Sequence, residues 1–288
     1  MTIVKTQYGI IGNPLEHSLS PVMHNAAFKA LGVNAEYKKY PLEENELEDF
    51  FARLREKTSP IFGLNVTVPY KEDVMGYMDS IVPLAQKIGA VNTVVINKDR
   101  KLVGYNTDAP GFLAHLAELK VDIKGKRIAV LGAGGSARAL LTAFCLLPEK
   151  PEAILVYNRT QQRLEQLMES LSKHLDISVI RSVLSIEELD LRSCDILINT
   201  TSIGLRQDDP ILIDESMLHP DLFVYDLIYN PTETLLLSMA REAGARTSNG
   251  LGMLFFQGVL ALQHWANMQI DDKVKLIMRE ALEEAAGL

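Results

Sequence analysis

Short apolar runs alternate with amphipathic segments along most of the chain, and Gly, Pro or Asn closes many of the runs. Runs rich in Val, Ile, Leu and Tyr predict β-strands. We expect strands at residues 9–11, 37–40, 61–68, 94–96, 102–105, 128–131, 153–157, 177–181, 196–199 and 223–227. Helical periodicity fills most of the intervals. We expect helices at 20–31, 43–55, 112–119, 163–175, 185–189, 233–243 and 272–286, with others opening near 70, 137 and 249.

The alternation of strand and helix is regular after residue 127, which predicts a doubly wound α/β domain. The chain has 288 residues, and that length suggests about two domains. We place the first domain at residues 1–107 and the second at 108–249. We expect residues 250–288 to return to the first domain.

The composition narrows the possible functions. A net charge of −8 argues against general affinity for nucleic acid or for an anionic membrane surface. No apolar run approaches the roughly 20 residues that span a bilayer, and residues 1–8 show no secretory signal. Cys145 and Cys194 are expected to be small buried thiols, with no metal site. We therefore expect a cytoplasmic protein.

A glycine-rich turn follows the strand at 128–131. Residues 132–137 read Gly-Ala-Gly-Gly-Ser-Ala, the G-x-G-x-x-A pattern of a phosphate-binding strand–turn–helix. Gly132 permits the tight turn, Gly134 lets the backbone approach a pyrophosphate, and Ala137 lets helix and strand pack closely. Free N–H groups at the helix start favour an anion. The pattern predicts a dinucleotide site, although many α/β proteins have a glycine at such a corner.

The end of the next strand indicates which dinucleotide binds. A site for NAD carries Asp or Glu about 20 residues beyond the loop, to bind the ribose 2′-hydroxyl. Here the strand ends in Asn158-Arg159-Thr160, and Arg163 follows one turn later. Two guanidiniums suit a 2′-phosphate. We therefore predict NADP, the alternative being that both arginines are ordinary surface charges.

Polar side chains also end two strands of the first domain. Asn65, Thr67 and Lys71 cluster at one strand end, and Asn106-Thr107-Asp108 end another. Ligands of open α/β sheets bind at such ends. A lysine in this position is, taken alone, more often a plain surface charge.

Two hydroxyls precede the first predicted helix. Ser20 followed by Pro21 is a helix start, with an N-cap hydroxyl and then proline in the first turn. Ser18 and Ser20 could hold a carboxylate there, or Ser20 could simply cap the helix. His17 and His24 are given no role in proton transfer, and His24 is expected to be structural.

Together these segments resemble the shikimate dehydrogenase family over nearly the whole chain. The resemblance depends on ordered motifs: Gly12-Asn13-Pro14 with His17-Ser18-Leu19-Ser20-Pro21, Asn65-Val66-Thr67-Val68-Pro69-Tyr70-Lys71, Gly89-Ala90-Val91-Asn92-Thr93, Gly104-Tyr105-Asn106-Thr107-Asp108, residues 132–137 with Asn158-Arg159-Thr160, and Asn249-Gly250-Leu251-Gly252-Met253. Ala109 departs from the glycine that the family often has there.

The resemblance implies an NADP-dependent oxidoreductase that interconverts 3-dehydroshikimate and shikimate, in the pathway to chorismate and the aromatic amino acids. It implies a substrate-binding catalytic domain at 1–107, a Rossmann-type NADP domain at 108–249, and C-terminal helices packed on the first domain. It further implies a monomer or a homodimer that takes a small-molecule substrate.

The resemblance also implies roles for individual residues. Lys71 and Asp108 would form the catalytic pair and would also contact the substrate. The other implied substrate residues are Ser18 and Ser20 for the carboxylate, Thr67, Asn92 and Gln257 for ring hydroxyls, and Tyr229 nearby. The implied cofactor residues are Gly132, Ala133, Gly134, Gly135, Ser136, Asn158, Arg159, Thr160, Arg163, Thr201, Leu227, Gly250 and Met253. A ketone that becomes an alkoxide needs a proton, which Lys71 can give, while Asp108 would hold the ammonium in place.

Three other functions remain open. A quinate or dual quinate/shikimate dehydrogenase resembles this pattern, but such relatives often use NAD or alter the carboxylate-binding serines. A non-catalytic NADP-binding sensor would usually have lost a catalytic residue. A two-domain dehydrogenase of folate or amino acids is not expected to carry the motif at 17–21.

Overall fold

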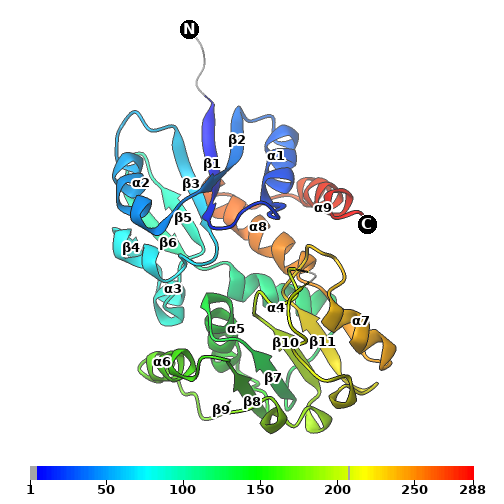
Figure 1. Ribbon diagram of the computed structural model, residues 1–288. Helices are drawn as coiled ribbons and strands as arrows, with labels where there is room; N and C mark the ends of the chain where they lie inside the picture. Colours follow the sequence, from blue (N-terminus) through cyan, green and yellow to red (C-terminus); the bar gives the residue numbers. More distant parts are fainter. Residues whose placement is uncertain (1–4, 207) are drawn as a thin grey trace. The chain divides into compact units, whose positions relative to one another are not determined.

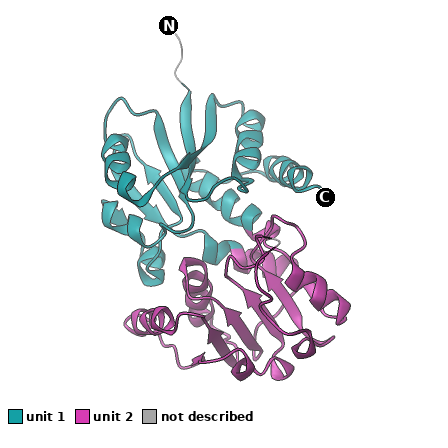
Figure 2. Cartoon of the chain, viewed as in Figure 1, with its two compact units in different colours: residues 1–111, 254–288 teal, residues 112–253 magenta. Residues whose placement is uncertain are grey.

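The computed structural model describes residues 5–206 and 208–288. The chain forms two compact units, unit 1 (residues 1–111 and 254–288) and unit 2 (residues 112–253), shown in Figure 2. The predicted return of the C-terminal segment to the first domain is confirmed. The boundaries predicted at 107 and 249 lie a few residues before those of the units.

Unit 1 contains a six-stranded mixed sheet in the order β2-β1-β3-β5-β6-β4 (Figure 1). Its strands are β1 (Thr6–Gly12), β2 (Ala35–Pro41), β3 (Ile61–Val66), β4 (Ser80–Ile81), β5 (Thr93–Ile96) and β6 (Leu102–Tyr105). β1 runs parallel to β2 and β3, whereas β5 is antiparallel to both β3 and β6. The ends of β1 and β3 therefore lie at the same edge of the sheet.

Among the described residues, four α-helices belong wholly to unit 1, and two more begin or end in it. The helices are α1 (Ser20–Ala30), α2 (Leu47–Leu54), α3 (Pro83–Ile88) and α9 (Asp272–Ala286), with α4 (Asp108–Glu118) and α8 (Leu251–Ala266) running through the unit boundaries. α1 packs against α9. Proline at 21 and at 83 stands in the first turn of its helix, where a missing N–H costs nothing.

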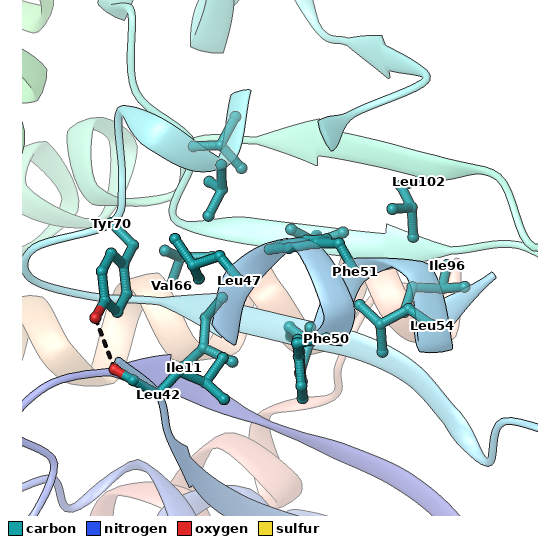
Figure 3. Packing of buried hydrophobic residues seen from close by; sticks show 14 of the residues in the cluster. Ile11, Leu42, Leu47, Phe50, Phe51, Leu54, Val66, Tyr70, Ile96 and Leu102 are labelled. Carbon is teal, nitrogen blue, oxygen red and sulfur yellow. Dashed lines mark hydrogen bonds between the residues drawn. The ribbon is translucent and has the colours of Figure 1, made fainter. Parts of the chain in front are cut away.

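The core of unit 1 forms beneath α2 (Figure 3). Phe50, Phe51 and Leu54 line one face of this helix and are buried together with Ile11 of β1 and residues of β3 and β6. Each such side chain contributes roughly 1.5–3 kcal/mol when buried. The Tyr70 hydroxyl donates to the Leu42 carbonyl across 2.6 Å, so the core also fixes the turn that follows β3.

Unit 2 contains six parallel strands in the order β12-β11-β10-β7-β8-β9. Its elements are β7 (Arg127–Leu131), α5 (Gly135–Leu146), β8 (Ala153–Tyr157), α6 (Gln161–Ser172), β9 (Ile180–Val183), β10 (Ile196–Asn199), β11 (Phe223–Asp226), α7 (Leu235–Glu242) and β12 (Arg246–Ser248). Numbered from β7, this is the 3-2-1-4-5-6 order of the dinucleotide-binding fold. The doubly wound α/β prediction is confirmed.

Some predicted elements are wrong in kind or place. The segment opening at Tyr70 is a turn followed by a 3₁₀ helix at Asp73–Tyr77, and residues 187–189 are also 3₁₀ rather than α-helical. The strand predicted at 177–181 forms at Ile180–Val183 instead. In each case few apolar positions define the local period.

Candidate active site

A lysine and an aspartate meet in unit 1. Lys71 lies in the turn after β3, and Asp108 is the first residue of α4. Lys71 Nζ is 2.7 Å from Asp108 Oδ2, and the two side chains are 11% and 7% exposed. Two charges removed from water in this way need further hydrogen bonds to offset desolvation. The interpretation of Lys71 as a plain surface charge is wrong, because the residue is buried.

Two asparagines fix Asp108, and only one of them, Asn92, was given a binding role from the sequence. Asn92 Nδ2 donates to Asp108 Oδ1 across 2.7 Å, which leaves the other carboxylate oxygen facing Lys71. Asn106 Oδ1 accepts the backbone N–H of Asp108 (3.1 Å) and of Ala109 (3.2 Å). Asn106 thus satisfies donors at the start of α4. For this reason the helix begins at residue 108 rather than at the predicted 112.

The two serines lie at the start of α1. Ser18 Oγ is buried and has no hydrogen-bond partner within the described residues, and Ser20 is 2% exposed. The prediction that Ser20 caps the helix is wrong: the N-cap is Leu19, and no side chain caps the helix. A buried hydroxyl without a partner calls for an explanation, and a bound polar ligand would supply one.

Two glycines allow close packing around the other two predicted substrate residues of unit 1, Thr67 and Gln257. A Cβ on Gly12 would lie 2.4 Å from Thr67 Cγ2, so the loop after β1 contacts the end of β3. A Cβ on Gly111 would lie 2.7 Å from the backbone nitrogen of Gln257. The absence of that carbon lets α4 and α8 approach each other, so Gln257 lies beside the helix that begins at Asp108.

The glycine-rich turn of unit 2 has the geometry of a phosphate-binding loop. Gly132 has φ +111°, and a Cβ there would lie 2.4 Å from Thr200 Oγ1. Gly134 is the N-cap of α5, and a Cβ on it would meet nothing within 4 Å. Open space therefore adjoins the free N–H groups of a helix start, which is where a pyrophosphate fits. Ala133, Gly135 and Ser136 complete the turn, and Ala137 is fully buried.

Two arginines, one in the turn after β8 and one in the first turn of α6, are free to bind an anion. Arg159 and Arg163 are exposed, and neither side chain forms a hydrogen bond or ion pair with any other described residue. Asn158 Nδ2 donates to the Thr160 carbonyl across 2.8 Å and closes the turn between them. Unpaired guanidiniums beside the glycine-rich loop fit the 2′-phosphate of NADP.

The other predicted cofactor residues follow β10, β11 and β12 or lie at the start of α8. Thr201 Oγ1 donates to Asn199 Oδ1 across 2.8 Å. A Cβ on Gly250 would lie 2.0 Å from the Leu227 carbonyl oxygen, so only glycine fits there. Met253 is buried in the first turn of α8, and Tyr229 is half-buried in the loop after β11. All predicted cofactor residues lie in unit 2, as does Tyr229, and the other substrate residues lie in unit 1.

Unit 2 holds a buried carboxylate, Asp226, to which no role was given from the sequence. Asp226 accepts hydrogen bonds from Asn199 Nδ2 (3.0 Å), Thr234 Oγ1 (2.7 Å) and the backbone N–H of Ile228 (3.1 Å). Burial raises the pKa of Asp226 to about 6 despite these donors. An acidic residue ending an apolar strand was the available signal.

Other titratable groups behave as core residues. Burial lowers the pKa of His24 to about 3 and raises that of the Cys194 thiol to about 11. Both cysteines are buried and free, as expected. Within residues 5–206 and 208–288 no group of three or more His, Cys, Asp or Glu could hold a metal ion, and no helix is long and apolar enough to cross a membrane.

Comparison with known proteins identifies the family. The family model described as "Shikimate dehydrogenase substrate binding domain" matches residues 10–94, and "Shikimate / quinate 5-dehydrogenase" matches residues 115–218. A shikimate dehydrogenase (NADP(+)) of Caldanaerobacter subterraneus subsp. tengcongensis is 42% identical over 268 residues, which cover 92% of each chain. This chain belongs to the shikimate dehydrogenase family.

Solved structures of shikimate dehydrogenases share the fold. That of Aquifex aeolicus has a TM-score of 0.86 and 35% identity, covering 98% of this chain and 99% of that one. That of Thermus thermophilus, in complex with NADP(H) and shikimate, has a TM-score of 0.81 and 35% identity, covering 97% and 99%. The resemblance read from the motifs is thereby confirmed.

Proposed function

We propose that this chain is an NADP-dependent shikimate dehydrogenase, which reversibly reduces 3-dehydroshikimate to shikimate in aromatic amino acid biosynthesis. The buried Lys71–Asp108 pair at 2.7 Å is the observation that carries the proposal. An ammonium held by a carboxylate, among the polar side chains of unit 1, supports the role of a proton donor for Lys71. Membership of the shikimate dehydrogenase family supplies the substrate.

The catalytic roles follow from the chemistry of a ketone and an alcohol. When bound, the nicotinamide of NADPH supplies a hydride to the carbonyl carbon. The carbonyl oxygen then gains negative charge, and Lys71 Nζ gives it a proton; in the reverse direction Lys71 removes the proton from the hydroxyl. Asp108 holds the ammonium and orients the reacting hydroxyl.

The binding roles divide by charge and polarity. Ser18 and Ser20 would bind the substrate carboxylate, an assignment that the unpartnered Ser18 hydroxyl supports. Thr67, Asn92 and Gln257 would bind ring hydroxyls, with Tyr229 close to the substrate.

The cofactor contacts are proposed on the geometry of unit 2. Residues 132–136 would take the pyrophosphate at the start of α5, and residues 158–160 with Arg163 the 2′-phosphate. Thr201, Leu227, Gly250 and Met253 would line the nicotinamide side. The open space at Gly134 and the unpaired arginines support these assignments.

A four-way assay tests the function. Initial rates are measured with shikimate and with quinate, each with NADP⁺ and with NAD⁺. We expect the highest kcat/KM with shikimate and NADP⁺. A preference for quinate with NAD⁺ would favour the quinate dehydrogenase alternative. Formation of neither NADPH nor NADH with any pair would favour a non-catalytic sensor. The cytoplasmic location and the monomeric or homodimeric state stay predictions.

A further inference from the structure

A chain of buried polar side chains runs through unit 1 and ends on the proposed catalytic pair. Its members are Tyr37, Asn65, Thr93 and Asn92, which are at most 4% exposed. They come from β2, β3, β5 and the residue just before β5. Polar groups this deep in a core must find partners, and here they find one another.

The first bonds in the chain have a fixed direction. The Tyr37 hydroxyl donates to Asn65 Oδ1 across 2.7 Å, so the amide nitrogen of Asn65 faces the other way. That nitrogen donates to Thr93 Oγ1 (3.1 Å) and to the carbonyl oxygen of Asn92 (3.3 Å). Because Thr93 Oγ1 accepts from Asn65, its own proton is available to Asn92 Oδ1, which lies 3.0 Å away.

The last bonds determine which way the Asn92 amide points. Asn92 Oδ1 also accepts the backbone N–H of Thr107 across 2.7 Å and the Thr107 hydroxyl across 3.2 Å. With its oxygen held by Thr93 and Thr107, Asn92 must turn its Nδ2 toward Asp108 Oδ1, at 2.7 Å. Asp108 then has one oxygen held by an amide and the other facing Lys71.

We infer that Tyr37, Asn65 and Thr93 are positioning residues for the catalytic pair, acting through the amide of Asn92 on the Asp108 carboxylate. The inference deepens the proposed function and rests on it. In a buried site of low dielectric, an ordered row of hydrogen bonds polarises in one direction and holds its last member firmly. None of these three side chains needs to touch the substrate.

Thr93 offers the sharpest test, because Val is close in shape and lacks only the hydroxyl. Thr93→Val removes one of the three donors to Asn92 Oδ1 and leaves Asn65 Nδ2 with only the longer bond to the Asn92 carbonyl oxygen. We expect kcat for shikimate oxidation to fall roughly 10- to 100-fold, as misplacement of catalytic groups does. KM should change less than kcat, because only Asn92 and Asp108 among the proposed substrate residues are displaced. Thr93→Ser keeps the hydroxyl and should restore kcat to within about threefold of wild type.

Two further variants separate positioning from general damage. Tyr37→Phe removes the first donor and keeps the ring stacked on His24, whose centroid is 4.5 Å away; its loss of kcat should be smaller than that of Thr93→Val. Thr142→Val is the matched control, since Thr142 is fully buried in unit 2 and its hydroxyl has no partner within the described residues. It should leave kcat unchanged.

A crystal structure of Thr93→Val gives a readout that does not depend on turnover. We expect Asn92 Nδ2 and the Asp108 carboxylate to move apart from their present 2.7 Å contact. Unchanged positions of Asn92 and Asp108, unchanged kcat, or equal losses in the Ser and Val variants would each overturn the inference. Wild-type protein without activity would instead overturn the proposed function. The distance between Asn92 and Asp108 in the crystal structure of the variant would then be the test of the positioning role.

Discussion

Lys71 and Asp108 are buried at a separation of 2.7 Å, where an ion pair often stabilises a protein less than apolar residues of the same size would. A role in proton transfer explains the buried pair better than a contribution to folding stability does. A buried ammonium held by a carboxylate is fixed in position, and it can exchange a proton with a reacting oxygen without water competing. Removing one partner leaves the other charge unpaired, which typically costs about 3–5 kcal/mol.

Lys71→Ala tests the proton-transfer role. We expect kcat to fall about 10²–10⁴-fold, with little change in shikimate affinity. NADP⁺ affinity, measured by fluorescence titration, should be retained because the proposed cofactor residues lie in unit 2. Lys87→Ala, an exposed lysine on α3, is the control and should behave as wild type. Near-normal turnover of Lys71→Ala, in protein shown by circular dichroism to be folded, would remove Lys71 from the mechanism.

Arg159→Ala and Arg163→Ala test the choice of cofactor. A hydrogen bond to a charged group contributes about 1.5–3 kcal/mol, so each variant should raise the KM for NADP⁺ roughly 10- to 100-fold. The KM for NAD⁺, which lacks the 2′-phosphate, should change little. Arg53→Ala, an exposed arginine of α2, serves as the control. Equal losses with both cofactors would contradict the assignment.

At the scale of elements, the sequence predicted best where an apolar pattern was long or tightly bounded. The strands at 102–105, 153–157 and 196–199 and the helix at 272–286 have the predicted bounds. β4, α3 and β12 were missed, because segments of two, six and three residues are too short to show a hydrophobic period. Long-range packing was also beyond reach: nothing near Asn92 in the sequence tells that its amide faces Asp108.

Asp226 accepts hydrogen bonds from Asn199 at the end of β10 and from Thr234 just before α7. Its burial makes the stability of this part of unit 2 depend on pH. Its pKa is about 6 in the folded protein, against an ordinary value of 3.8. Asp226 therefore contributes fully to the free energy of unfolding below about pH 4, where it is protonated in both the folded and the unfolded chain. This contribution, roughly 2–3 kcal/mol, is lost as pH rises through 6.

Asp226→Asn should remove this pH dependence. Asparagine can still accept from Asn199 and Ile228, and it carries no charge. We expect equal melting temperatures for the variant and wild type at pH 4, and a higher melting temperature for the variant at pH 8. Asp221→Asn, an exposed residue of unit 2, should show no such difference between the two pH values. A variant less stable than wild type at pH 8 would contradict the argument.

At the scale of the whole molecule, the proposed binding residues separate by unit. Lys71, Asp108 and the other proposed substrate residues except Tyr229 lie in unit 1, and the glycine-rich loop with its arginines lies in unit 2. The chain enters unit 2 after residue 111 and leaves it after 253, so α4 and α8 each contribute residues to both units. The motifs at 104–108 and 249–253 stand close to these two crossings.

Hydrogen exchange should map each ligand to its own unit. Ligand binding slows exchange where it stabilises local structure. We expect NADP⁺ alone to protect backbone amides at 132–138 and 158–163, where the helix start and the arginines bind phosphate. Shikimate alone should protect amides at 18–20, 65–68, 70–71 and 106–109. Protection by NADP⁺ confined to unit 1 would contradict the assignment of the glycine-rich loop, and protection by shikimate confined to unit 2 would contradict that of Lys71 and Asp108.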